Sequence, residues 1–196
     1  MKPEGRPPLQ RGFRSLPRVA SLVAAALLGG CAGTATTRVT LTPPDQAPVC
    51  QPDAALKAAV LWRTQWRADQ KDVPEREAAA AQGVTRFFAD GGCFVAAVVA
   101  RAEAGRSDFA VPAGADLLLV LTVRELGPTV KLLSSAALVE GGTEAVVDVA
   151  VVRPGRRKPD REFSIRWQDG GPGVVKGVQT LPEDLAAALK AGLMPR

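Results

Sequence analysis

Acid and base chemistry in this chain would fall to carboxylate side chains, because its 196 residues include no histidine and no tyrosine. A serine or cysteine nucleophile would lack the histidine that usually activates it. The serine signatures Ser-x-x-Lys and Gly-x-Ser-x-Gly are also absent from the sequence. The candidates are three close pairs of acids and one isolated acid: Glu75/Glu77, Glu140/Glu144, Asp160/Glu162 and Glu125.

Each pair has a structural explanation beside the chemical one. The first would complement a helix N-terminus, the second would flank an exposed hairpin, and the third would open a strand whose outward face is polar. Glu125 stands inside an apolar strand, where burial would favour its protonated form unless Arg124 or another base pairs with it. We therefore expect that the protein is not an enzyme and that it binds no metal and no cofactor. Carboxylate-based hydrolysis of peptidoglycan is the least favoured function.

A different chemistry centres on Cys31, which follows Leu28-Gly29-Gly30. Residues 1–30 combine a basic start with the apolar stretch 19–30, as in an export signal. This arrangement resembles the lipobox of bacterial lipoproteins, and the resemblance implies a diacylglyceryl thioether on Cys31, cleavage before it and acylation of the new amine. The twelve apolar residues are too few for a membrane span, which needs about 20. The alternative is an ordinary secretory signal, cut near Ala32-Gly33.

An acylated Cys31 would keep the protein on a membrane, because two or more acyl chains give stable anchoring. Ala32, in place of an aspartate, resembles the pattern of outer-membrane lipoproteins, so the expected location is the periplasmic face of the outer membrane. Loss of residues 1–30 leaves 20 basic and 19 acidic side chains, so the pI of about 9.5 belongs mostly to the leader. The charge of the mature chain therefore predicts no nucleic-acid partner.

The two remaining cysteines, Cys50 and Cys93, form an even pair in an exported chain. Disulfides persist in the compartments to which such chains are sent. We predict that Cys50 and Cys93 are bridged, and two buried thiols are the alternative.

Composition divides the chain into three parts. They are a signal peptide over 1–30, an acylated cysteine with a Thr/Pro-rich tether over 31–52, and a single α+β domain over 53–196. A short strand is possible at 37–42, within the tether.

Two helices are predicted in the domain. Pro74 and an acidic first turn open a helix over about 74–89, which Gly91-Gly92 end. A capping box at Thr180–Glu183 opens the second helix, whose leucines recur every four residues as far as Leu193.

Two kinds of strand are predicted. Residues 58–69 and 162–167 alternate between apolar and polar, which is typical of half-buried strands. Residues 93–101 and 116–126 are near-continuous apolar runs, which predict central strands covered on both faces.

Gly141-Gly142 predicts a two-residue hairpin turn between the strand segments 130–139 and 143–152. Asp169–Gly173 is expected to be a flexible loop and not a phosphate-binding one, because no Gly-Lys-Ser or Gly-Lys-Thr follows it. Together these elements predict an α+β fold, with a mostly antiparallel sheet of about five to six strands and two helices packed on one face.

This layout resembles that of several small envelope lipoproteins. A strand, a helix ending at Gly91-Gly92, and a strand are followed by Gly114-Ala115-Asp116 at the start of an apolar strand. A hairpin and a final helix complete a pattern similar to the curli-secretion lipoprotein, the lipoprotein activators of penicillin-binding proteins and the N-terminal domain of TolB. The resemblance implies a non-catalytic accessory or assembly factor that works through contacts with an envelope protein partner.

Two further features are candidate contacts. A basic cluster could touch anionic lipid head groups or an acidic partner, and it comprises Arg153, Arg156, Arg157 and Lys158. Three tryptophans either pack in the core or line an apolar groove: Trp62, Trp66 and Trp167. The groove would make the protein a lipid-binding or transport-auxiliary lipoprotein, which is the alternative function.

Replacing Cys31 by alanine tests the lipobox. Without the thiol no diacylglyceryl group can be attached, so we expect Cys31→Ala to leave unprocessed precursor in the inner-membrane fraction or to release soluble protein. Cell fractionation and immunoblotting measure the outcome. A variant that fractionates like the wild type would contradict the lipoprotein interpretation.

Overall fold

The computed structural model describes residues 34–51, 54–90, 92, 94–103, 109–133 and 138–195. These residues belong to one compact unit, Gly33–Arg196. Cys31 and Cys93 lie outside the described residues. Neither helix in the described part of the chain is long and apolar enough to cross a membrane.

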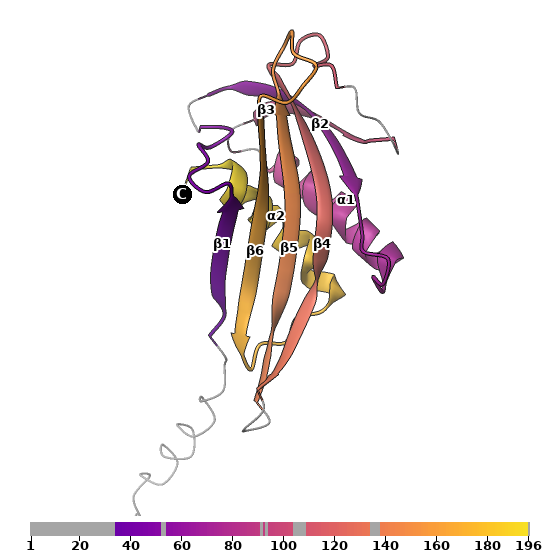
Figure 1. The fold of residues 1–196 in the computed structure, drawn as a ribbon, viewed down its shortest axis with the longest axis vertical. Coiled ribbons are helices and arrows are strands. Elements are labelled where there is room, and N and C mark those ends of the chain that lie inside the picture. The colour runs from indigo at the N-terminus through magenta and orange to yellow at the C-terminus, as the bar shows by residue number, and fades with distance from the viewer. Residues whose placement is uncertain are drawn as a thin grey trace, which may run out of the picture. The chain divides into compact units, whose positions relative to one another are not determined.

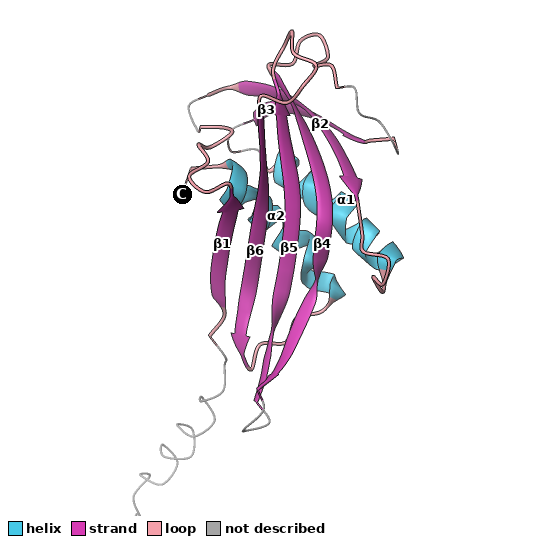
Figure 2. Ribbon diagram, viewed as in Figure 1, coloured by secondary structure: helices cyan, strands magenta, loops and turns pink. Residues whose placement is uncertain are grey.

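The described residues form a six-stranded sheet and two helices (Figure 2). The strands lie in the order β1-β6-β5-β4-β2-β3 across the sheet. In chain order the elements are β1 (Thr36–Thr42), β2 (Leu56–Thr64), α1 (Val73–Ala89), β3 (Phe94–Arg101), β4 (Leu117–Leu133), β5 (Leu138–Val152), β6 (Arg161–Pro172) and, after a 3-10 turn (Val178–Thr180), α2 (Leu181–Leu193).

The sheet is mixed, so the prediction of a mostly antiparallel sheet is wrong, although the α+β class is confirmed. β1, β6, β5 and β4 are antiparallel neighbours, whereas β2 runs parallel to both β3 and β4. Parallel neighbours need a crossover connection. α1 supplies the crossover from β2 to β3, and the segment after β3 supplies the one to β4.

The two apolar runs have different places in the sheet. β4 is buried from Leu117 to Val123, as predicted for a central strand covered on both faces. β3 is an edge strand with Val95 62% and Val98 74% exposed, so its prediction as a central strand is wrong. Similar sequences thus differ in burial because the crossovers place one inside the sheet and the other at its edge.

The main core lies between the sheet and the two helices, which cover the same face (Figure 1). α1 buries Ala80, Val84 and Phe88, and the leucine stripe of α2 is fully buried as far as Leu193. Both helices therefore follow their predicted apolar stripes. A smaller cluster on the opposite face is built on Leu118 and its neighbours.

β1 brings part of the expected tether into the sheet. It forms an edge strand that pairs with β6, from Thr36 opposite Gly170 to Thr42 opposite Ser164. The strand that the sequence allowed at 37–42 is therefore present and carries the folded unit back to Thr34.

Gly141 and Gly142 lie inside β5, so the predicted hairpin turn there is wrong. They face Gly171 and Gly170 of β6, and the supposed loop at Asp169–Gly173 is largely the end of that strand. A Cβ on Gly142 would lie 2.6 Å from the carbonyl oxygen of Asp169 and 2.9 Å from the Cα of Gly170. These glycines are therefore present because two backbones pass close together, and not because a turn needs them.

Gly142→Ala tests this close passage. The added methyl group would press on backbone atoms that cannot move independently, so we expect a loss of about 3 kcal/mol in the free energy of unfolding. The control is Gly177→Ala, since a Cβ there meets the amide end of the Gln179 side chain, which can move away. Urea denaturation measures both, and equal small losses would contradict the argument.

Candidate functional site

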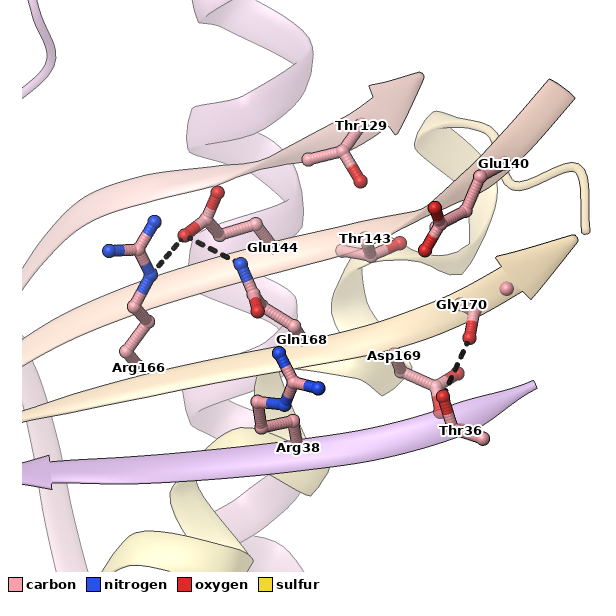
Figure 3. Close-up of a pocket in the computed structure, with 13 residues that line it drawn as sticks. Thr36, Arg38, Thr129, Glu140, Thr143, Glu144, Arg166, Gln168, Asp169 and Gly170 are labelled. Atoms are coloured by element: carbon pink, nitrogen blue, oxygen red, sulfur yellow. Dashed lines mark hydrogen bonds and ion pairs between the residues drawn. The ribbon is translucent and has the colours of Figure 1, made fainter. Parts of the chain in front are cut away.

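A polar hollow of about 260 Å³ lies at the end of the sheet where β1 begins (Figure 3). Its glycine floor comes from β5 and β6, and polar side chains of β1, β4, β5 and β6 surround it. The hydroxyl of Thr143 is buried there without a hydrogen-bond partner among the described residues. The polar lining residues are Thr36, Arg38, Thr129, Glu140, Thr143, Glu144, Arg166, Gln168 and Asp169.

The hollow brings Glu140 and Glu144 to one place but does not make them a catalytic pair. Glu144 Oε1 lies 2.6 Å from Arg166 Nε and accepts a hydrogen bond of 3.3 Å from Gln168 Nε2. Four residues along a strand separate the two Cα atoms by about 13 Å. In Figure 3 the two carboxylates lie apart and are not directed at a common point. The arrangement is suited to binding a small polar group and not to paired acid and base work.

One acid of each of the other two pairs, Glu77 and Asp160, has contacts within the fold. Thr64 donates to Glu77 at 3.0 Å, and Arg101 lies 3.0 Å from the same carboxylate. The hydrogen bond from Arg101 and then that from Thr64 lower the pKa of Glu77 below its ordinary value. Asp160 accepts a hydrogen bond of 3.0 Å from the backbone N–H of Arg153, so it shapes a turn.

Glu125 pairs with two bases, as one reading of the sequence allowed. Its carboxylate lies 3.4 Å from Arg67 and 3.5 Å from Arg76, whereas Arg124 contacts Asp148. The structure therefore does not bury Glu125 without a partner, as a catalytic general acid would require.

Arg76 is a buried cation that sequence reasoning missed. It lies on α1 and donates to the carbonyl of Lys71 at 2.8 Å and to that of Leu126 in β4. The signal in the sequence was a charged residue on the apolar stripe, four positions before Ala80 and eight before Val84. Gly127 leaves room for the guanidinium, which a Cβ there would strike.

Lys176 is the centre of a half-buried polar cluster, which we call the lysine clasp and which comprises Lys176, Asp169, Asp184, Thr37 and Thr180. Its ammonium lies 2.6 Å from Asp169 of β6 and 2.8 Å from Asp184 of α2. Thr37 of β1 donates to Asp169 at 2.6 Å. The clasp therefore joins three elements where the chain turns from β6 into α2.

The clasp also explains why the predicted capping box is wrong. The hydroxyl of Thr180 lies 3.0 Å from the carbonyl of Gly177 and 3.0 Å from Asp184, and it makes no side-chain cap. The sequence pattern is that of a helix start, and α2 does begin at Leu181. The Thr180 hydroxyl, however, lies against the Asp184 carboxylate of the ion pairs and does not cap the helix.

Opposing effects set the pKa values in the clasp. Burial alone would raise the pKa of Asp169, but hydrogen bonds from Lys176 and Thr37 and the charge of Lys176 leave it below its ordinary value. Burial alone would lower the pKa of Lys176, but hydrogen bonds to Asp169 and Asp184 and their charges leave it raised. Asp169 and Lys176 are therefore both held in their charged forms at neutral pH.

The basic cluster forms an exposed turn between β5 and β6. Gly155 adopts a φ of 79° in this turn, and Arg156 lies 3.7 Å from Asp160. Arg157 and Lys158 are exposed and make no ion pair with another described residue. We call Arg153, Arg156, Arg157 and Lys158 the basic turn.

The tryptophans pack in the core, which was one of their two predicted roles. Trp62 is 6% exposed and Trp167 is 4% exposed. Trp66 lies beyond the end of β2 and packs against the same core. Trp62 and Trp167 therefore line no apolar groove, whereas Trp66 lines an open hollow of about 360 Å³ whose other lining residues are Gln65, Arg67, Arg124, Glu125 and Val146.

Cys50 is buried at the edge of the main core. Because Cys31 and Cys93 lie outside the described residues, the lipid on Cys31 and the Cys50–Cys93 disulfide stay predictions.

The chain matches no protein-family model and no curated protein. Among solved structures it is similar to the PelC dodecamer from Paraburkholderia phytofirmans, at 14% identity and a TM-score of 0.41, with 83% of this chain and 100% of that one covered. A putative neuraminyllactose-binding hemagglutinin homolog from Helicobacter pylori has 14% identity and a TM-score of 0.36, covering 74% and 84%. A minor lipoprotein from Acinetobacter baumannii has 13% identity and a TM-score of 0.33, covering 71% and 92%. Likenesses at this level assign no family.

Asp169→Asn tests the lysine clasp. The change removes a charge that faces a half-buried ammonium, so we expect the free energy of unfolding at neutral pH to fall by about 2 kcal/mol. Because the folded pKa of Asp169 is lowered, its contribution is fully present above the ordinary value of 3.8 and is lost as the pH falls through the folded value. The difference between wild type and variant should shrink at acid pH, and a difference that grows there would contradict this.

Proposed function

We propose that this protein is a membrane-anchored envelope lipoprotein that acts as a non-catalytic accessory or assembly factor through protein contacts. Acylated Cys31 would hold it at the periplasmic face of the outer membrane. The basic turn is the contact surface of the proposal, and its partner is an acidic surface of another envelope protein.

The observation that carries the proposal is the position of the basic turn relative to the start of the folded unit. Thr36 pairs with Gly170 near the end of β6, whereas Arg161 begins β6 directly after the basic turn. Nine residue-to-residue steps along β6 separate Arg161 from Gly170, which is roughly 30 Å. Figure 1 shows the β5–β6 turn and the start of β1 at opposite ends of the sheet.

The distance matters because only a short stretch of chain would join the anchor to the folded unit. Three peptide units join Cys31 to Thr34, and they reach at most about 11 Å. Head groups of the anchoring membrane would therefore lie near Thr34, far from the basic turn. An acidic protein partner fits the exposed cations better than those head groups do.

The contact chemistry is electrostatic and works through side chains that the fold leaves free. Arg157 and Lys158 carry charge into solvent, and the turn that presents them is held by contacts of Asp160 with the backbone of Arg153 and the side chain of Arg156. Oppositely charged surfaces speed association and fix orientation. A preformed turn loses little conformational entropy on binding.

Replacing Arg157 and Lys158 together by alanine tests the contact surface. We expect the double variant to keep its membrane fractionation and its stability but to lose its main crosslinked partner in live cells. The readout is pull-down of the acylated protein after crosslinking. The control is Arg86→Ala with Lys190→Ala, which removes two exposed cations from the helices. An unchanged set of partners in the basic-turn variant would contradict the proposal.

A further inference from the structure

Exposed valines gather at the end of the sheet where the folded unit begins. Val175 is 91% exposed and Val130 is 68% exposed. Val175 belongs to the loop between β6 and α2, and Val130 belongs to β4. Large apolar side chains this open to water are informative when they cluster.

The register places these valines beside the start of the chain. Val130 pairs with Gly141, and Gly141 pairs with Gly171. A Cβ on Gly141 would meet the Val174 carbonyl and lie 3.8 Å from the Cα of Val175. A Cβ on Gly171 would lie 2.6 Å from the carbonyl oxygen of Thr34. The valines and Thr34 therefore share one level of the sheet, across about 15 Å of neighbouring strands.

We propose that this apolar end, formed by Val130 and Val175, rests on the lipid surface of the membrane that holds acylated Cys31. The inference depends on the proposed lipoprotein function, because the lipid brings the surface to this end. Three peptide units cannot carry Thr34 more than about 11 Å from Cys31. The acyl chains would thus hold the valines within reach of the acyl boundary, where interfacial apolar groups bury.

Charges near the apolar end are compatible with contact at lipid head groups. Lys176 follows Val175 directly, but it is neutralised by Asp169 and Asp184 within the lysine clasp. Arg38 lines the polar hollow at the same end and is exposed. Its guanidinium would face lipid phosphates when the valines enter the interface.

The test places a tryptophan at Val175 and asks whether lipid quenches it. Acylated Val175→Trp protein is reconstituted into phosphatidylcholine vesicles that carry bromine on their acyl chains. The native tryptophans are the buried Trp62 and Trp167 and the half-buried Trp66, and the unsubstituted protein in the same vesicles gives their background, which is subtracted. The matched control is Val98→Trp, at another exposed valine, which lies on β3. Neither position is in the core, so both variants should fold.

We expect the added emission of Val175→Trp to fall by about half, since interfacial groups lie roughly 5–10 Å into the boundary. The emission of Val98→Trp should not change. Equal quenching of both variants, or no quenching of Val175→Trp, would overturn the inference. A blue-shifted but unquenched Val175→Trp would mean that a second copy of the chain covers this end, which overturns it as well.

Flotation of the same vesicles separates this inference from the proposed function. Wild-type protein that does not float with the vesicles would overturn the lipid anchor itself. Protein that floats while Val175→Trp stays unquenched would leave the anchor intact and remove only the membrane contact of the valines.

Discussion

Antiparallel pairing of β1 with β6 is the contact on which the arrangement of this protein depends. Seven residue pairs, from Thr36 opposite Gly170 to Thr42 opposite Ser164, fix the edge of the sheet and the point at which the chain enters it. The same pairing fixes which turns lie near that point and which lie far away. An anchor a few residues before Thr34 would therefore keep that end of the sheet at the membrane, and a sheet standing upright on it would direct the basic turn away from the membrane.

Two local features stabilise the end of the sheet at which β1 begins. Glycines of β5 and β6 let the two backbones approach closely, and a side chain at Gly142 would collide with Asp169 and Gly170. The lysine clasp then ties β1, β6 and α2 together, because Lys176 satisfies two carboxylates at once. Loss of either carboxylate would leave a half-buried charge less well paired, which is destabilising. The clasp also removes the charge that would oppose contact of Val175 with lipid.

The sequence predicts local elements well and the arrangement of strands poorly. The periodicities of α1 and α2 identify both helices, because an apolar stripe depends only on neighbouring residues. The apolar run of β3 does not reveal that β3 lies at an edge, since this depends on crossovers far along the chain. Gly141-Gly142 has the composition of a turn, yet the glycines serve a contact with β6 that is remote in sequence. Of the candidate site, the exposed basic turn is predictable, but the lysine clasp is not, because β6, α2 and β1 meet only in the fold.

The central claim is that the basic turn faces away from the anchoring membrane, and its most direct test is to measure the height of residue 158 above the bilayer. A donor dye on Lys158→Cys in acylated, vesicle-bound protein would transfer energy to acceptor lipids in the bilayer. A separation of about 30 Å or more, as the length of β6 requires, is the predicted result. A dye at the level of the head groups would contradict the account, because the basic turn would then be a lipid contact and not a surface for a protein partner.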